Sequence, residues 1–229
     1  MKLVFSCEHG GNEIPEYYKH LFKNADEALN SHRGIDFGTL DLFNYCSSLS
    51  AYSISNKISR LLIELNRSLH HPKLFSEYTA ALNDAEKSKL IDLIYNPYRD
   101  KLEAEISKII AEGEEVAHIS FHSFTPVLDG KIRNADIGLL FDPSRASEKM
   151  ICKKLKELLK TEIPAFIIRF NYPYLGKADG LTTYLRKKFP ENYSGIEIEI
   201  NQKLSNKNVF ETDLKNAIYN SIKELKKPN

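Results

Sequence analysis

The sequence has few cysteines, almost no net charge and no long apolar run. Its three cysteines, Cys7, Cys46 and Cys152, are odd in number and widely spaced, which argues against a disulfide framework and a Cys-x-x-Cys metal site. A formal net charge of +1 creates no field that would attract nucleic acid. No run approaches the roughly 18 apolar residues of a membrane span, and the N-terminus lacks a secretory signal pattern. We therefore expect a cytoplasmic protein with neither a nucleic-acid partner nor a membrane partner.

The chain is long and apolar enough to form a sizeable core. It has 229 residues, of which 42% are hydrophobic and 28% are charged, as in an ordinary globular protein. We find no internal repeat, low-complexity tract or linker. A single domain over residues 1–229 is the simplest prediction.

Strand-like and helix-like segments alternate along the chain. Apolar runs typical of buried strands cover 2–6, 51–55, 61–65, 116–122, 136–141, 165–169 and 195–200. Helical spacing of apolar residues covers 38–49, 84–111, 147–159 and 211–225. This alternation predicts an α/β fold with a mixed, mainly parallel sheet and helices on both faces.

Polar side chains follow several of these strands at their carboxyl ends, where sheets of this kind bind ligands. They are Glu8 and His9, then Glu64, Asn66 and Arg67, then His122 and Ser123, then Arg169 and Asn171, and finally Glu197 and Glu199. Each signal is weak alone, but histidine, carboxylate and arginine converge repeatedly on one edge. The sequence therefore predicts a site there.

Two of the histidines have the setting of metal ligands. His9 and His122 each close an apolar strand, and a catalytic zinc usually takes three protein ligands. Asp36, before Gly38 and a helical run, is our first candidate for the third ligand. Glu13 is the second candidate, and Glu8 competes less well because its side chain should point away from that of His9. A hydrogen-bonded packing role for the two histidines is about as compatible with the pattern.

Glu199 and the arginines suggest further roles. In "GIEIEIN" the two glutamates share one face of the strand, and Glu199, nearer the strand end, would suit a general base. A merely solvated face is the alternative. Arg67, Arg133 and Arg169 could bind the carboxylates of an anionic substrate, although surface ion pairs are the common role of single arginines.

Several motifs together resemble one family. "SCEHGGNEIP", "HRGIDFGT", "SRLLIELNRS", "SFHSFTPV", "RNADIGLLFDPSR", "RFNYPYLGKADG" and "GIEIEINQ" occur in the order and spacing of the N-formylglutamate amidohydrolases. The resemblance covers residues 6 to about 202. It implies a fold like that of the zinc carboxypeptidases, and hydrolysis of an N-formyl or other N-acyl amino acid by attack of a metal-bound water. The implied cofactor is one divalent metal ion, with zinc as the first choice.

The resemblance also implies roles for single residues. His9, His122 and Asp36 would hold the metal, and Glu199 would be the general base. Arg67 and Arg133 fall on positions suited to substrate carboxylates, and Asn171 falls on the family's Asn-x-Pro-Tyr segment. Arg133 or Arg169 would stabilise the oxyanion, and Ser123 would contact the substrate.

Other functions are compatible with the same motifs. A carboxypeptidase or amidase acting on peptides or cell-wall fragments would use a similar site, and a metal-free relative would only bind a ligand. The acyl group, the amino acid, the metal and the oligomeric state are left open by the sequence.

Overall fold

A six-stranded sheet forms the centre of the fold in the computed structural model, which describes residues 1–226. The strands lie in the order β2, β1, β3, β8, β6, β7. Their bounds are Lys2–Cys7 (β1), Tyr52–Ser55 (β2), Val116–Phe124 (β3), Ile137–Leu140 (β6), Ile168–Phe170 (β7) and Tyr193–Asn201 (β8). The first four in this order are mutually parallel, whereas β6 is antiparallel to β8 and parallel to β7. The predicted mixed, mainly parallel sheet is confirmed.

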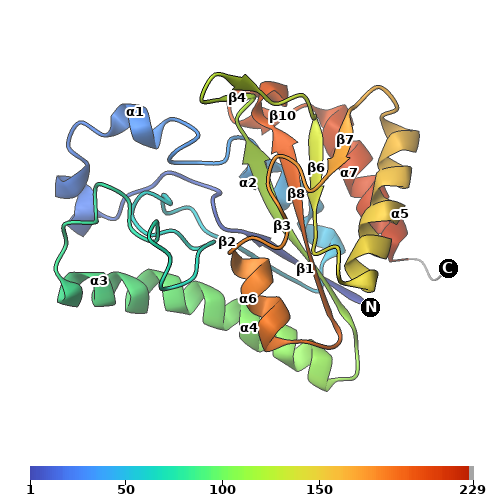
Figure 1. The fold of residues 1–229 in the computed structure, drawn as a ribbon, viewed down its shortest axis with the longest axis horizontal. Helices are drawn as coiled ribbons and strands as arrows, with labels where there is room; N and C mark the ends of the chain where they lie inside the picture. Colours follow the sequence, from blue (N-terminus) through green and yellow to red (C-terminus); the bar gives the residue numbers. More distant parts are fainter. Residues whose placement is uncertain (227–229) are drawn as a thin grey trace.

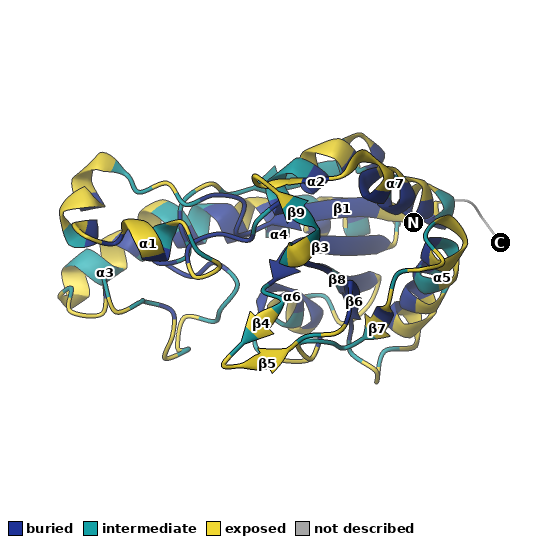
Figure 2. Ribbon diagram, turned by 90° about the horizontal axis from the view of Figure 1, so that it is seen from above, coloured by how far each residue is buried: buried dark blue, intermediate teal, exposed yellow. Residues whose placement is uncertain are grey.

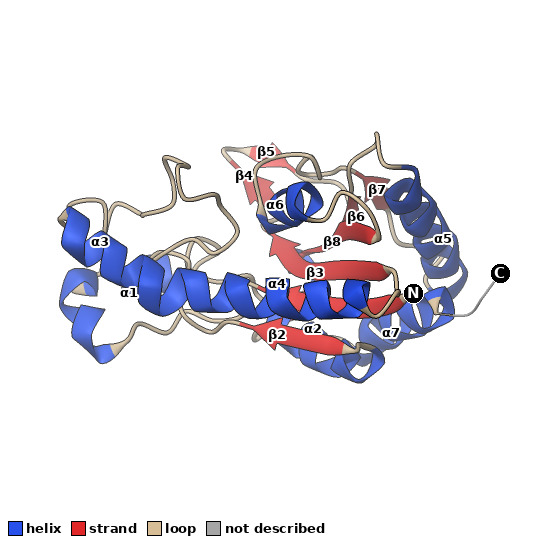
Figure 3. Cartoon of the chain, turned by 90° about the horizontal axis from the view of Figure 1, so that it is seen from below, coloured by secondary structure: helices blue, strands red, loops and turns tan. Residues whose placement is uncertain are grey.

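Helices cover both faces of this sheet, as expected (Figure 3). Helices α2 (Thr39–Cys46), α5 (Ala146–Glu162) and α7 (Thr212–Leu225) bury their apolar residues against one face. Helices α4 (Asn96–Ala111) and α6 (Leu181–Lys188) cover the other. The central strands β1, β3, β8 and β6 are almost wholly buried, as the dark blue of β1 and β3 in Figure 2 shows, whereas the edge strands β2 and β7 are partly exposed.

Strand β3 has two different faces, and this difference places the site. Its residues Ile119 and Phe121 join the apolar cluster beneath α2, α5 and α7. Its alternate residues His118, Ser120 and His122 are just as buried but point to the opposite face. A polar column therefore runs up the α4 side of the sheet toward its carboxyl edge.

The segments 11–37 and 57–83, which flank α2 and β2 in the sequence, form a lobe beside the sheet, blue and teal in Figure 1. It contains the 3₁₀ helix η1 (Glu16–Phe22) and the short helix α1 (Asp26–Leu29). Below it, helix α3 (Asp84–Leu90), the π-helical turn η3 (Ile91–Tyr95) and α4 form one long rod. An Asn83–Glu86 capping box begins this rod. Within residues 1–226, no helix has the length and apolarity needed to cross a membrane.

Small elements complete the edges of the fold. Two hairpins pair β4 (Val127–Leu128) with β5 (Lys131–Ile132), and β9 (Ser205–Asn206) with β10 (Val209–Phe210). The 3₁₀ turns η2 (Ser47–Leu49) and η4 (Gln202–Leu204) follow α2 and β8.

Segment 61–65 is not the strand that its apolar run predicts. It forms turns, in which the backbone N–H of Leu62 donates to the carbonyl of Ser59 over 2.9 Å, and that of Glu64 donates to Leu74 over 2.9 Å. Its leucines and isoleucine are buried in the cluster under α4 and α6. Burial without strand pairing explains why the composition resembles a strand.

The expectation that the carboxyl end of β7 lies at the edge where β1 and β3 end is also wrong. Leu139 of β6 is paired with both Phe170 of β7 and Ile198 of β8, and β6 and β7 run opposite to β8. The chain after Phe170 therefore leaves the sheet away from the edge that carries His9 and His122. Asn171 is therefore carried away from that edge, whereas Arg169, in register with Gly138 and Glu199, stays level with His122.

Candidate active site

His9, Asp36 and His122 meet at the carboxyl edge of the sheet. His9 directly follows β1, His122 lies in β3, and Asp36 lies in the loop before α2. The backbone N–H of Asp36 donates to the carbonyl of His9 over 3.1 Å, which ties this loop to the end of β1. All three side chains are buried, and together they form a group able to hold a metal ion.

The donor atoms of this group fit a small divalent metal. Nδ1 of His9 lies 3.3 Å from Oδ2 of Asp36, and Nδ1 of His122 lies 3.0 Å from the same oxygen. Zinc bonds of about 2.0–2.1 Å in a tetrahedron separate neighbouring ligands by about 3.3 Å. Two imidazoles and one carboxylate are also a donor set that suits zinc. Both the chemistry and the spacing are those of a three-residue metal site.

Each imidazole is held from behind by a second carboxylate. Nε2 of His9 contacts Oε1 of Glu64, and Nε2 of His122 lies 3.0 Å from Oε2 of Glu8. Ser120 also donates to Glu8 over 2.6 Å. Metal-binding histidines generally donate their other ring N–H to a carboxylate or carbonyl, which fixes the tautomer. Both rings are thus oriented with Nδ1 toward Asp36.

The two outer carboxylates were not assigned this role from the sequence. Glu8 was weighed only as a metal ligand, and Glu64 only as a polar residue near a strand end. The sequence does contain one signal for the role of Glu8. Strand alternation places Glu8 and His9 on opposite faces of the sheet, and Glu8 lies on the face where it contacts His122.

Arg60 completes the cluster and was missed by the sequence reasoning. Its Nε donates to Oε2 of Glu64 over 2.7 Å, and its Nη1 donates to Oδ1 of Asp36 over 3.2 Å. Arg60 was missed because it precedes the apolar run 61–65. If that run were a parallel strand, Arg60 would lie at its amino end, at the edge of the sheet opposite His9 and His122. The turns of that segment instead bring Arg60 into contact with both Glu64 and Asp36.

The buried charges of this cluster do not cancel without a further cation. Three carboxylates, Glu8, Asp36 and Glu64, face one guanidinium, Arg60, which leaves a net charge of −2 before the histidines are counted. Buried charge without compensation is costly. Two imidazolium protons or one divalent metal with neutral imidazoles would supply the missing +2.

The pKa shifts of Asp36, His122 and His9 show the same demand for positive charge. Burial alone would raise the pKa of Asp36, but His9 and His122 outweigh burial and hold that pKa well below its usual range. Burial alone would lower the pKa of His122, but hydrogen bonds to Asp36 and Glu8 raise it well above the ordinary value. Glu64 and Asp36 raise the pKa of His9 in the same way, against burial and Arg60. The carboxylates around the two imidazoles therefore favour positive charge at this position, which protons or a metal ion can supply.

Glu199 lies beside this cluster with a different environment. It is paired in register with His122 across β8 and β3 and is only 4% exposed. Its Oε2 is buried without a hydrogen-bond partner among the described residues. Burial raises the pKa of Glu199 to about 8, and the nearby negative charge of Asp36 acts in the same direction. A carboxyl group with such a pKa can carry a proton near neutral pH.

Three other candidate residues lie around the cluster. Ser123 is buried, and its backbone N–H donates to Asp36 over 3.3 Å. Arg133 is half-buried and donates to the Tyr174 hydroxyl over 3.1 Å. Burial lowers the pKa of His32, and the positive charges of Arg133 and Arg60 lower it further. The guanidinium of Arg67 is occupied by the backbone carbonyl of Asp179.

The remaining candidates have other partners. Arg169 is exposed, and its guanidinium carbon lies 5.0 Å from the ring centroid of Tyr172. Through Gly138 it is in register with Glu199 and His122, so it shares their face of the sheet, two strands beyond Glu199. Asn171 accepts hydrogen bonds from the backbone N–H groups of Phe141 and Gly176, each over 3.0 Å, so its side chain shapes its own loop. Glu13 is exposed and lies outside the metal-binding group, so Asp36 is the third member of that group.

Solved structures with the same fold support this architecture. A gene product from Agrobacterium tumefaciens has 24% sequence identity and a TM-score of 0.77, covering 98% of this chain and 88% of that chain. An N-formylglutamate amidohydrolase from Ralstonia eutropha has 17% identity and a TM-score of 0.69, covering 98% of this chain and 92% of that chain. Looser matches include a metallo-carboxypeptidase from Burkholderia cenocepacia, with 13% identity and a TM-score of 0.40 over 98% of this chain and 56% of that chain. A search of curated proteins finds no significant match.

The chain is thus a mixed α/β protein with a buried cluster of two histidines and one aspartate at the carboxyl edge of its sheet. The model of the N-formylglutamate amidohydrolase family matches residues 1–205, and the chain belongs to that family. The resemblance noted in the sequence is therefore confirmed.

Proposed function

We propose that the protein hydrolyses the amide of an N-formyl or other N-acyl acidic amino acid, with N-formylglutamate as the first candidate, and that it depends on one divalent metal, zinc before others. The observation that carries this proposal is the charge of the buried cluster. Three carboxylates against one arginine leave a deficit that a divalent ion held by His9, Asp36 and His122 would remove. Such an ion would act there as a Lewis acid that polarises the acyl carbonyl and lowers the pKa of water.

Glu199 is the proposed proton carrier. Its unpartnered Oε2 would accept a proton from the attacking water and return it to the leaving nitrogen. Burial raises the pKa of Glu199, which suits return of the proton, and a divalent ion beside it would lower that pKa again and favour the carboxylate that accepts the proton. Burial beside His122 keeps the group positioned and excludes bulk water.

The remaining polar residues would hold the ligands and the substrate in place. Glu8 and Glu64 would keep both imidazoles oriented, and Arg60 would hold Glu64 and Asp36 against each other. Arg133, half-buried near the cluster, supports the assignment of an anionic substrate. Its guanidinium would bind a carboxylate of the amino-acid part.

The test compares wild type with matched variants for metal content and for formate release from N-formylglutamate. Wild type should contain close to one metal per chain and release formate, and His122→Ala should lose both the metal and the activity. Glu199→Gln should keep the metal but lose about 10²–10⁴-fold in kcat. Glu197→Gln is the control, because Glu197 is held by Thr182 over 2.7 Å farther down the same strand.

A substrate panel distinguishes the neighbouring activities. N-acetylglutamate tests the acyl group, a neutral N-formyl amino acid tests the acidic side chain, and short peptides test carboxypeptidase or amidase activity. Release of amino acids from peptides without formate release would favour carboxypeptidase or amidase activity. A wild-type protein that binds no added zinc, cobalt or manganese would refute the metal-dependent mechanism.

A further inference from the structure

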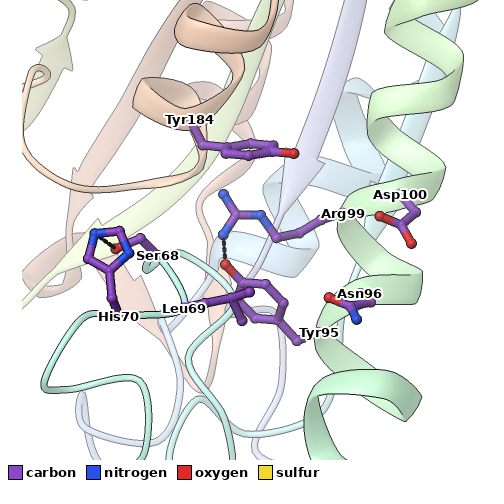
Figure 4. Close-up of a pocket in the computed structure, with 8 residues that line it drawn as sticks. All are labelled: Ser68, Leu69, His70, Tyr95, Asn96, Arg99, Asp100 and Tyr184. Carbon is purple, nitrogen blue, oxygen red and sulfur yellow. Dashed lines mark hydrogen bonds between the residues drawn. The ribbon is translucent and has the colours of Figure 1, made fainter. Parts of the chain in front are cut away.

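A cavity separate from the metal-binding group lies on the flank of the molecule, between α4, α6 and the segment that follows Glu64 (Figure 4). Its volume is about 250 Å³, near the lower end of small-molecule sites. The lining residues are Ser68, Leu69, His70, Tyr95, Asn96, Arg99, Asp100 and Tyr184. None of these side chains belongs to the metal-binding group or to the residues that orient it.

The guanidinium of Arg99 is the central feature of this cavity. It lies between two aromatic rings, with its carbon 4.8 Å from the centroid of Tyr95 and 4.4 Å from that of Tyr184 (Figure 4). Arg99 is only 5% exposed. Its Nη1 donates to the backbone carbonyl of Arg67 over 2.8 Å and also contacts the Tyr95 hydroxyl. Its Nη2 is buried with no hydrogen-bond partner among the described residues.

Arg99 also has no paired anion within the described part of the chain. Glu8, Asp179 and Glu103 act on it only through longer-range electrostatics, and burial lowers its pKa. A buried cation without a partner is costly, whereas an incoming anion would satisfy both the charge and the free N–H groups. Aromatic rings stabilise the cation only in part.

The walls of the cavity indicate the chemistry of that anion. Leu69, Tyr95 and Tyr184 supply apolar and aromatic surface around a single arginine. Asp100 also lines the cavity and would repel a doubly charged phosphate more strongly than a single carboxylate. A monocarboxylate on a flat or apolar body therefore matches the walls best.

We propose that this cavity is a binding site for a small apolar or aromatic carboxylate, which pairs with Arg99 and packs its apolar body against the cavity wall. Nη2 is shielded in the present arrangement, so a ligand must displace an exposed lining side chain. Leu69 is 52% exposed, whereas the Tyr184 hydroxyl donates to Glu103 over 2.6 Å, so Leu69 is the side chain that a ligand would displace. The site is independent of the metal cluster and of the proposed reaction.

The probe for this site is 4-bromobenzoate, measured by calorimetry against the full-length protein with and without chelator. We expect binding that is unaffected by metal removal, and no comparable binding of the neutral 4-bromobenzamide. Arg99→Met should weaken binding at least about tenfold, since it removes a charge-assisted hydrogen bond. Arg33→Met, which alters an exposed arginine paired with Glu77, should bind the probe like wild type.

A second pair of variants keeps the test valid if Arg99→Met fails to fold. Leu69→Glu places a carboxylate on the exposed wall and should abolish binding, whereas Leu69→Gln should reduce it far less. In a crystal soaked with the probe, the anomalous signal of bromine should lie in the cavity beside Arg99.

Three results would overturn the proposal. The first is equal affinity of wild type and a folded Arg99→Met variant, or of the two Leu69 variants. The second is bromine found only at the metal-binding group, with binding lost after chelation. The third is absence of probe binding, or tighter binding of inorganic phosphate, which would remove the carboxylate assignment.

Discussion

His118 should make the stability of the protein depend on pH in a defined window. The residue is fully buried in the polar column of β3, with Nδ1 2.7 Å from the Tyr193 hydroxyl and Nε2 2.8 Å from Ser6 Oγ. Burial lowers its pKa from an ordinary 6.5 to about 4. The unfolded chain therefore binds a proton between these two values while the folded chain does not.

The sign and size of the effect follow directly. The stabilisation is fully present above pH 6.5 and is lost as the pH falls toward 4, because protonation favours the unfolded chain. At about 1.4 kcal/mol per pH unit, the gap corresponds to about 3 kcal/mol. His9 and His122 contribute with the opposite sign, since their raised pKa values favour the folded chain at low pH. A comparison with a variant is needed to isolate His118.

The assay is urea unfolding of wild type and His118→Gln in the presence of chelator, at several pH values from 4 to 7. Glutamine keeps one donor and one acceptor but does not titrate, so both proteins share every other contribution. Wild type should lose about 3 kcal/mol more than the variant across this window. Equal losses in the two proteins would refute the assignment of a buried neutral imidazole.

Three further predictions concern the metal cluster and the sheet around it. Glu8→Gln should weaken metal binding about 10–100-fold in a metal titration, whereas Glu197→Gln should leave it unchanged. Acidification should weaken metal binding because the metal displaces imidazole protons, and calorimetry in buffers of different ionisation enthalpy should show proton release. Gly138→Ala would place its Cβ 1.9 Å from the carbonyl oxygen of Tyr172 and should cost about 1–3 kcal/mol in urea unfolding. A Gly138→Ala protein as stable as wild type would contradict this packing argument.

Much of the site could be predicted because two strand ends are easy to find in the sequence. The apolar runs before His9 and His122 stop abruptly at polar residues, and parallel strands bring such ends together. Gly38 likewise signals the helix start after Asp36; it adopts a positive φ of 79° directly before Thr39.

The rest could not be predicted, for two physical reasons. The run 61–65 is buried without strand pairing, and periodicity alone cannot separate that state from a strand, so the roles of Arg60 and Glu64 stayed hidden. The short strands β6 and β7 carry no mark of direction in their sequences, because hydrophobic pattern reports burial and not orientation. Their reversal carried Asn171 away from the predicted edge, whereas Arg169 stayed in register with Glu199.

The position of β8 has a consequence for the order in which the strands of the sheet can pair. It is the last strand of the central sheet in the sequence, yet it lies between β3 and β6. While the ribosome is still producing residues 193–201, β3 and β6 each present an unpaired edge, and such edges promote association with other chains. Glu199 arrives on that same strand and takes its place beside His122 only when the gap closes. The sheet and the edge that carries His122 are therefore completed only when β8 enters the gap.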